Sequence, residues 1–131
     1  DVPDPRSNLC MSLSASNAEI FFAEVTEGGS VWAIRDLAGF PTSTSASGET
    51  AMPFWSKKSR AEKIIEGVKA YSNFEPFELS LAEFIENWLP GLEGDGLFVG
   101  LNWYGKRATG YNSSPADVCE RLIRANPSGQ K

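Results

Sequence analysis

The sequence predicts an α+β fold in a single domain, with four helices packed on a mixed or antiparallel sheet of four or five strands. Two observations support this prediction. Apolar residues recur with helical spacing in four segments, and short runs rich in β-branched and aromatic residues lie between these segments. With 131 residues, of which 41% are hydrophobic, the chain is long enough to bury one core without disulfides or a metal.

Residues 1–10 are expected to lie outside this domain. They contain two prolines and two aspartates but no apolar period, and Met11 follows at a position suited to a natural start. We therefore expect a disordered tail or an upstream segment at residues 1–10. A single globular domain of unknown function is expected over residues 11–131.

Four helix starts are predicted by a serine that precedes an acidic residue by three positions. The serine hydroxyl can accept a hydrogen bond from the third backbone N–H, and the acidic side chain complements the helix dipole. Apolar residues at helical spacing follow each serine. The four pairs are Ser16 and Glu19, Ser59 and Glu62, Ser80 and Glu83, and Ser114 and Asp117.

Five short runs between these helices are predicted to be strands. Pro53 and Pro76 fall in two of the runs, and because proline has no N–H to donate, we expect them at strand ends or edges. The Ser- and Thr-rich stretch 42–50 is expected to be a loop, and residues 104–107 a hairpin loop. The predicted strands are residues 31–35, 52–55, 74–79, 97–103 and 108–111.

The composition excludes several kinds of chemistry. The chain has no histidine, so serine, cysteine or zinc sites that need an imidazole are ruled out. Cys10 and Cys119 lack metal-type spacing and are typical of reduced thiols. No apolar run approaches the length that spans a membrane, and no secretory signal pattern is present. We expect a cytoplasmic protein with no cofactor, no metal and no membrane contact.

The candidate binding residues are aromatic or cationic. Tryptophan combines a large apolar ring with a polar N–H and is common both in cores and at interfaces. Trp55 lies where a strand meets the helix that carries Arg60, so an aromatic wall could stand beside free backbone N–H groups. The full candidate set is Trp32, Arg35, Phe54, Trp55, Arg60, Trp103 and Arg107.

The leading functional hypothesis is a non-enzymatic binding or protein-interaction module. It would contact an unknown protein partner, or a second copy of itself, near Trp55 and Arg60. No set of nucleophile and base is apparent, and the segment GKRATG has the glycine spacing of a phosphate loop but lacks the Lys and Ser/Thr that should follow.

Two alternatives stay open. A small-ligand-binding protein or a carboxylate-based hydrolase would use Asp36, Glu93 or Asp95 with Arg35 or Arg107, provided that the carboxylates converge in a pocket. Single-stranded nucleic-acid binding would use the basic segment 57–69. It is disfavoured because the whole chain has a net charge of −5, whereas nucleic-acid binders are usually basic.

Several runs of the sequence match a known family pattern. They include VWAIRD, GFP, MPFWS, SRAEKII and ATGY, together with FEPFELSLAEFIENWLPGLEGDGLFVGLNW, whose W-L-P-G-L-x-x-D-G segment is fairly specific. Over residues 16 to about 124 the chain resembles the bacterial domain of unknown function family 2750. The resemblance implies a small bacterial α+β protein. It implies no catalytic residue, because the family has no assigned activity.

Overall fold

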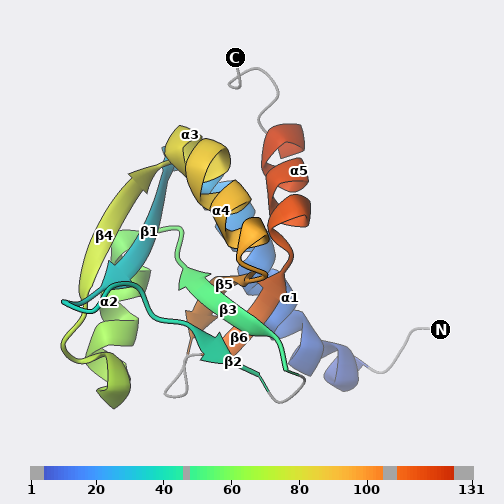
Figure 1. Ribbon diagram of the computed structural model, residues 1–131. Helices are drawn as coiled ribbons and strands as arrows, with labels where there is room; N and C mark the ends of the chain where they lie inside the picture. Colours follow the sequence, from blue (N-terminus) through green and yellow to red (C-terminus); the bar gives the residue numbers. More distant parts are fainter. Residues whose placement is uncertain (1–4, 46–47, 105–108, 126–131) are drawn as a thin grey trace.

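The strands form two separate sheets. The computed structural model describes residues 5–45, 48–104 and 109–125. Within these residues it contains a four-stranded mixed sheet, a two-stranded antiparallel sheet and four α-helices, the third of which is interrupted by a π-helical turn (Figure 1). The predicted α+β class is confirmed.

The larger sheet has the strand order β2-β3-β5-β6. Strands β3 and β5 are parallel, and the other two pairings are antiparallel. Among the strands of the described residues, β2 is the one that the sequence did not predict, because its two polar residues show no alternation and lie in the stretch expected to be a loop. The bounds are Ser43–Thr44 for β2, Thr50–Phe54 for β3, Phe98–Tyr104 for β5 and Thr109–Ser113 for β6.

The smaller sheet pairs β1 (Ser30–Arg35) with β4 (Glu75–Ser80). Its β1 strand also contacts the chain just after β3. Trp32 and Trp55 exchange two backbone N–H···O hydrogen bonds, each of 2.7 Å. This bridge joins the two sheets at a corner, from which the chain continues into the second helix.

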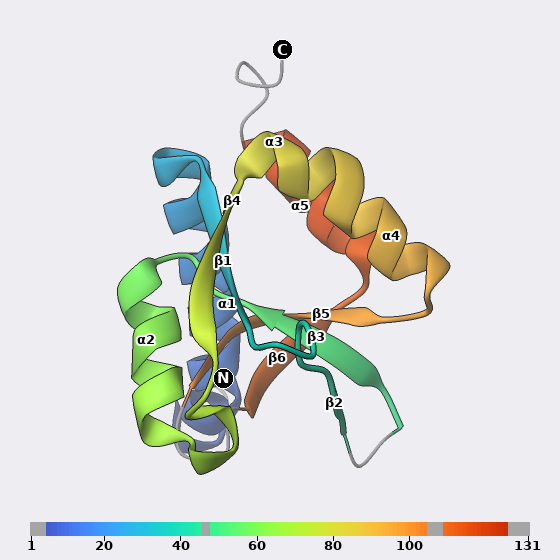
Figure 2. The same ribbon diagram turned by 60° about the vertical axis from the view of Figure 1, so that its left-hand side comes forward.

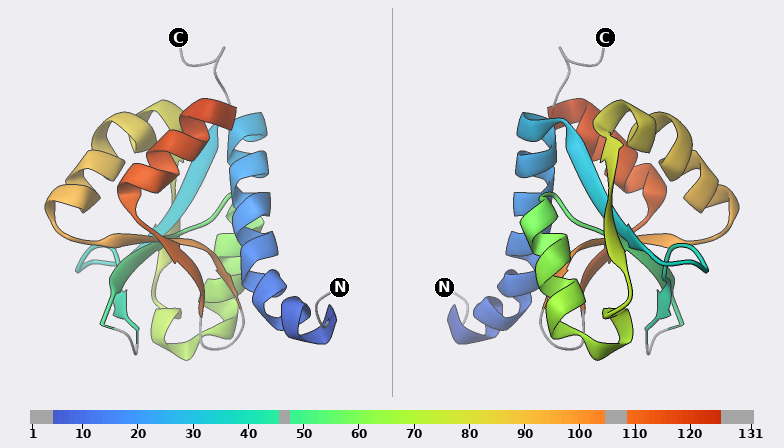
Figure 3. Two further views of the ribbon diagram at one scale, coloured as in Figure 1. Left: turned by 90° about the vertical axis from the view of Figure 1, so that its right-hand side faces the viewer. Right: turned by 90° about the vertical axis from the view of Figure 1, so that its left-hand side faces the viewer.

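The helices lie on both sides of the β1–β4 ribbon. The first helix, α1 (Pro5–Gly28), runs along β5, β6 and α5 (Pro115–Ala125), and α5 packs on α4 (Leu89–Gly94). In contrast, α2 (Lys58–Gly67) packs on β1 and β4 from the other side, followed by the 3₁₀ turn η1 (Lys69–Tyr71) (Figures 2 and 3). No helix in the described part of the chain is both long and apolar enough to cross a lipid bilayer.

Two of the four predicted caps are confirmed. The Ser80 hydroxyl accepts from the Glu83 N–H at 3.1 Å, and the Ser114 hydroxyl accepts from the Asp117 N–H at 3.2 Å. The cap predicted at Ser59 is wrong, because α2 begins at Lys58 after an N-cap residue, Lys57, that makes no side-chain cap bond. Tertiary hydrogen bonds of the preceding residue set this start, as described below.

The first helix also differs from the prediction. It begins at Pro5 and passes through Ser16, so Ser16 lies inside a helix and does not cap one. The helix therefore includes part of the segment that we expected to be a tail. The domain boundary at residue 11 stays a prediction.

A π-helical turn interrupts the third predicted helix. The helix starts as α3 (Leu81–Glu83), widens into η2 (Phe84–Trp88) and continues as α4. Pro90 follows the wide turn, and it has no N–H for the carbonyl four residues earlier, against which its ring would also clash. The wider turn relieves this conflict and lets the helix continue.

The buried apolar side chains form two groups on opposite faces of the strands. The main core lies between the sheets, α1, α4 and α5 and includes Phe21, Phe54, Phe84 and Leu101. The second core lies under α2 and includes Trp55, Ile64 and Trp103. Because side chains alternate along a strand, the neighbours Phe54 and Trp55 point into different cores.

Candidate functional site

A pocket of about 290 Å³ lies beside the second core, where α2 faces the end of β5. Helix α2 contributes Arg60, Lys63, Ile64 and Gly67, which are spaced i, i+3, i+4 and i+7 and therefore form one stripe of the helix. The buried Ala61 and Val68 lie on the adjacent stripe, which packs on the second core. One helix thus supplies both a core face and a pocket face.

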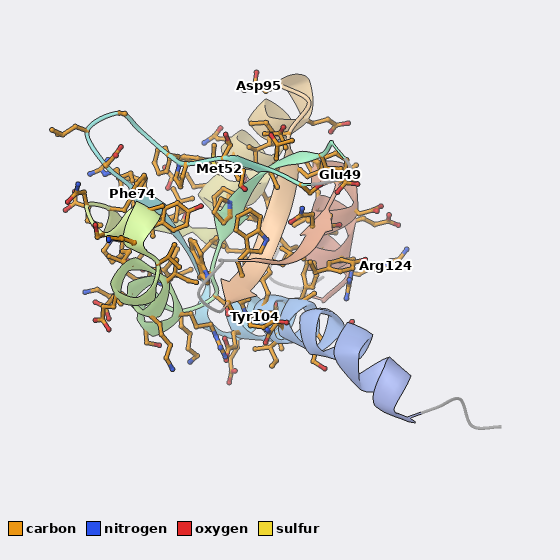
Figure 4. All side chains as sticks on the ribbon, turned by 90° about the horizontal axis from the view of Figure 1, so that it is seen from below. Glu49, Met52, Phe74, Asp95, Tyr104 and Arg124 are labelled. Atoms are coloured by element: carbon orange, nitrogen blue, oxygen red, sulfur yellow. The ribbon has the colours of Figure 1, made fainter. Side chains whose placement is uncertain are left out.

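Strand β5 contributes three consecutive residues to the pocket: Asn102, Trp103 and Tyr104. A regular strand would point neighbouring side chains to opposite faces. Here the pairing of β5 with β6 shifts register between Leu101 and Tyr104, and Asn102 has a left-handed backbone with φ of 50°. This bulge is a common device for turning side chains toward a site. Figure 4 shows Tyr104 at the end of β5, next to α1.

The Trp103 indole occupies a space that two glycines leave open. A Cβ on Gly100 would overlap the indole, and a Cβ on Gly110 would lie 3.0 Å from the ring. The indole N–H donates to Asn112 Oδ1 at 3.0 Å. The ring is therefore fixed in place and only 5% exposed.

Trp55 helps to hold Trp103 in place. Its side chain has no exposed surface, and its indole N–H donates to the Trp103 carbonyl at 2.9 Å. The surface open to solvent comes instead from the rim residues, among them Arg60, whose side chain is 36% exposed, and Tyr104. The pocket has an apolar floor and a cationic rim.

A polar network holds the rim in place. Glu24 on α1 forms a two-pronged ion pair with Arg60, with Nε–Oε1 and Nη2–Oε2 distances of 3.0 Å. The Ser56 hydroxyl donates to the same carboxylate and accepts from Asn102 Nδ2 at 3.0 Å. Asn102 Oδ1 accepts from the Ser56 N–H at 2.9 Å, so the chain before α2 is fixed from two sides.

The electrostatics of this network favour an ionised glutamate. The hydrogen bond from Arg60 is the main influence that lowers the pKa of Glu24 below its ordinary value of 4.5. The Ser56 hydrogen bond and the charge of Lys57 act in the same direction, whereas partial burial opposes them. Glu24 is therefore a poor proton acceptor and a good anchor for Arg60.

The structure brings three of the predicted site residues together and places the others elsewhere. Trp55, Arg60 and Trp103 line the pocket. Trp32 is half-buried beneath α2, and Phe54 is fully buried in the main core. Arg35 lies over the Phe77 ring at 4.2 Å and lines a different hollow. Arg107 lies outside the described residues.

The carboxylates considered for a hydrolase do not meet. Asp36 accepts from the Ala38 N–H in a turn and lines one hollow, whereas Glu93 lines another. Asp95 follows α4 and lies at the top of Figure 4, away from Tyr104, which lies lower in the view beside α1. Within the part of the chain that the structure describes, no three Cys, Asp or Glu side chains gather in a way that could hold a metal ion.

Sequence reasoning missed six of the nine lining residues and the two further members of the polar network. These residues are Asn17, Lys63, Ile64, Gly67, Asn102 and Tyr104, together with Glu24 and Ser56. Lys63 and Gly67 share a helical stripe with Arg60, so their spacing could have indicated them. Glu24 and Asn102 had no such signal, because their partners are 36 and 46 positions away in the chain. The bulge that turns Asn102 toward the site also has no local signature in the sequence.

Comparison with known proteins gives a family but no activity. No curated protein and no solved structure matches the chain. The family model described as "Protein of unknown function (DUF2750)" matches residues 18–122, which is more than half of the chain and includes eight of the nine residues that line the pocket, all but Asn17. The chain therefore belongs to the DUF2750 family, as the resemblance noted in its sequence implies.

Proposed function

We propose that this protein is a non-enzymatic binding protein and that its pocket at Arg60 and Trp103 holds a small ligand. The observation that carries the proposal is the pocket itself, which combines a rigid apolar floor with a cationic rim. Ligand sites in proteins are usually concave and mostly apolar, with a few placed polar groups. A volume of about 290 Å³ is at the lower end of that range and suits a ligand of about one or two rings.

The polar network beside the pocket supports binding more than catalysis. Ser56 and Glu24 form a hydroxyl–carboxylate pair, which in principle could be a nucleophile and its base. However, the hydroxyl is buried, and Ser56 is not among the residues that line the pocket. Arg60 also keeps the pKa of Glu24 low, which weakens it as a base. The pair holds the rim and does not face a substrate.

A pocket-filling variant tests this proposal. Gly67 is the last residue of α2 and lines the pocket, and a Cβ added there meets no atom within 4 Å. Gly67→Leu should therefore fold normally and occupy part of the space. Gly94→Leu is the matched control, because Gly94 also ends a helix and also has open space around its Cβ position.

The measurement is a ligand-observed NMR screen of small aromatic and aliphatic compounds, charged and neutral. We expect compounds that bind the wild type and Gly94→Leu equally well. Gly67→Leu should weaken their binding at least about tenfold, which corresponds to about 1.4 kcal/mol. The proposal fails if no compound binds, or if Gly67→Leu and Gly94→Leu bind the hits equally well.

A protein partner, self-association and single-stranded nucleic-acid binding stay predictions, as does a cytoplasmic location. A protein that docked here would touch the rim, because Trp55 has no exposed surface. Light scattering over a range of concentrations tests self-association. Titration with a single-stranded oligonucleotide at low salt tests nucleic-acid binding, which should be strongly salt-dependent if it occurs.

A further inference from the structure

We infer that the ligand is an aromatic carboxylate, held with its acid group at the rim between Arg60 and Lys63 and its ring against the apolar floor. This inference rests on the proposed function and specifies the ligand class for the same pocket. Three features of the described residues support it: the net charge of the rim, the donors that stay open on the rim, and the chemistry of the floor.

The charge of the rim matches one negative charge. Arg60 and Lys63 are the two charged residues among those that line the pocket, and both are cations. Glu24, which lies on α1, pairs with Arg60. The two cations and this one carboxylate therefore leave the rim with a net charge of +1. Within the described residues, Lys63 forms no ion pair, although Lys58 on the same helix pairs with Glu62. A monoanion would neutralise the rim without leaving an excess charge.

The open donors of Arg60 suit a carboxylate. Glu24 occupies the Nε and one Nη2 N–H, whereas Nη1 makes no hydrogen bond to any described residue. The guanidinium is a planar fork with five donors, so one carboxylate can fix its orientation while another binds the remaining edge. Because the ion pair already fixes the side chain, a ligand that binds it loses less conformational entropy. Lys63 adds a second cation one helical turn away.

The floor favours an apolar ring over a polar ligand. Both indole N–H groups are already used, by the Trp103 carbonyl and by Asn112, so neither indole has a donor left for a ligand. Asn102 is also fully engaged, and no described buried side-chain N or O lacks a partner. Apart from the Asn17 amide and the Tyr104 hydroxyl, the described lining offers no open side-chain partner below the cationic rim, so a polar group buried against the floor would be left unpaired at a cost of about 1–3 kcal/mol. The partly exposed Tyr104 ring can pack against an aromatic ligand.

Three probes test the inference by isothermal titration calorimetry: indole-3-carboxylate, its neutral analogue indole-3-carboxamide, and acetate. A hydrogen bond to a charged group is worth more than a neutral one, so we expect the carboxylate to bind about tenfold or more tightly than the carboxamide. Acetate should not compete at concentrations that saturate the pocket with the indole acid. Equal affinities for the carboxylate and the carboxamide, or tight binding of acetate, would overturn the inference.

Two charge-reversal variants distinguish an effect of the rim on binding from an effect of the protein's overall charge. Lys63→Glu changes a residue of the rim, whereas Lys69→Glu makes the same change at an exposed lysine outside the pocket lining. Lys63→Glu should weaken indole-3-carboxylate about tenfold and leave indole-3-carboxamide unchanged, and Lys69→Glu should alter neither. Equal effects of the two variants on the carboxylate would contradict the assigned rim.

The outcomes also distinguish this inference from the proposed function. If indole-3-carboxamide binds as tightly as the acid and Gly67→Leu weakens both, the pocket binds ligands but the ligand class inferred here is wrong. If neither indole compound nor any screened compound depends on Gly67, the proposed function fails as well.

Discussion

Phe54 and Trp55 are neighbours in the chain, yet they are buried in two different ways. Phe54 points into the main core, where its ring packs edge-on against Phe84 and Trp88 at centroid distances of 4.9 and 5.9 Å. Trp55 points into the second core, where its N–H donates to the Trp103 carbonyl. One side of the corner is held by apolar packing, and the other combines packing with directed hydrogen bonds.

The difference bears on the proposed function, because the candidate pocket lies beside only one of the two cores. The two buried polar residues among the described ones, Ser56 and Asn102, hydrogen-bond to each other beside the pocket. Buried polar groups contribute little net stability and are costly when unpaired, so a core gains little from them by stability alone. Here they fix the start of α2 and the bulge of β5, which together shape the pocket. On the proposed function, the main core provides stability and the second core provides the geometry for binding.

The largest expected effect is on the main core. Phe84→Ala removes a fully buried ring that contacts both Phe21 and Phe54, and it should lower the free energy of unfolding by about 3–5 kcal/mol. Urea denaturation measures this loss. The milder Phe84→Leu should keep the affinity for indole-3-carboxylate, because the pocket does not include this residue. A loss of affinity in Phe84→Leu would contradict the claim that the main core and the pocket are independent.

Gly100→Ala should lower stability less than Phe84→Ala does, but it should strongly reduce ligand affinity. The added methyl group overlaps the Trp103 indole, which is buried and hydrogen-bonded and has little room to move. Such overpacking typically costs about 1–3 kcal/mol. The near-ultraviolet circular dichroism should change and ligand affinity should fall. Gly94→Ala, which meets no neighbouring atom, is the control, and an equal response in both variants would contradict the role given to Gly100.

The smallest expected effect concerns Glu24 and depends on pH. The lowered pKa means that ionised Glu24 stabilises the folded protein above its ordinary pKa of 4.5, and that this contribution is lost as the pH falls through the folded value. Glu24→Gln should therefore be less stable than the wild type at pH 7, by about 1 kcal/mol because Arg60 is partly exposed to solvent. The difference should shrink below pH 4.5.

Urea unfolding of both proteins at pH 7 and in acid measures this difference. Glu86→Gln changes an exposed glutamate that forms no ion pair with a described residue, and it should leave stability at pH 7 unchanged. A gap between wild type and Glu24→Gln that is constant with pH would show that the ion pair does not anchor Arg60.

Local patterns in the sequence predicted much of the fold. The apolar spacing around Phe84 and the serine caps at Ser80 and Ser114 are decided within one or two helical turns, so the chain carries their signal directly. The cap expected at Ser59 failed because Ser56, through hydrogen bonds to Asn102 and Glu24, fixes the chain one turn earlier. Contacts that form only in the folded chain therefore overrode the local tendency of Ser59 to cap a helix.

The candidate site was predictable in part for the same reason. Trp55 and Arg60 are five positions apart at one junction, and Trp103 belongs to an aromatic strand, so all three were visible in the sequence. The sequence also favoured Arg60 over Arg35, because Arg60 follows Trp55 at the same junction. The meeting of Arg60 with the bulge of β5 was not predictable, because it depends on the folded geometry of that strand. That geometry arises from the left-handed Asn102 and from the glycines that admit the Trp103 ring.

The most direct test of a ligand pocket at the second core is a protein-observed NMR titration with indole-3-carboxylate. Using ¹⁵N-labelled wild-type protein, we predict saturable shift changes at Gly67, Asn102, Tyr104 and the Trp103 indole N–H, with the Trp88 indole N–H unchanged. No saturable shifts, or shifts centred on the main-core helices α4 and α5, would contradict the account.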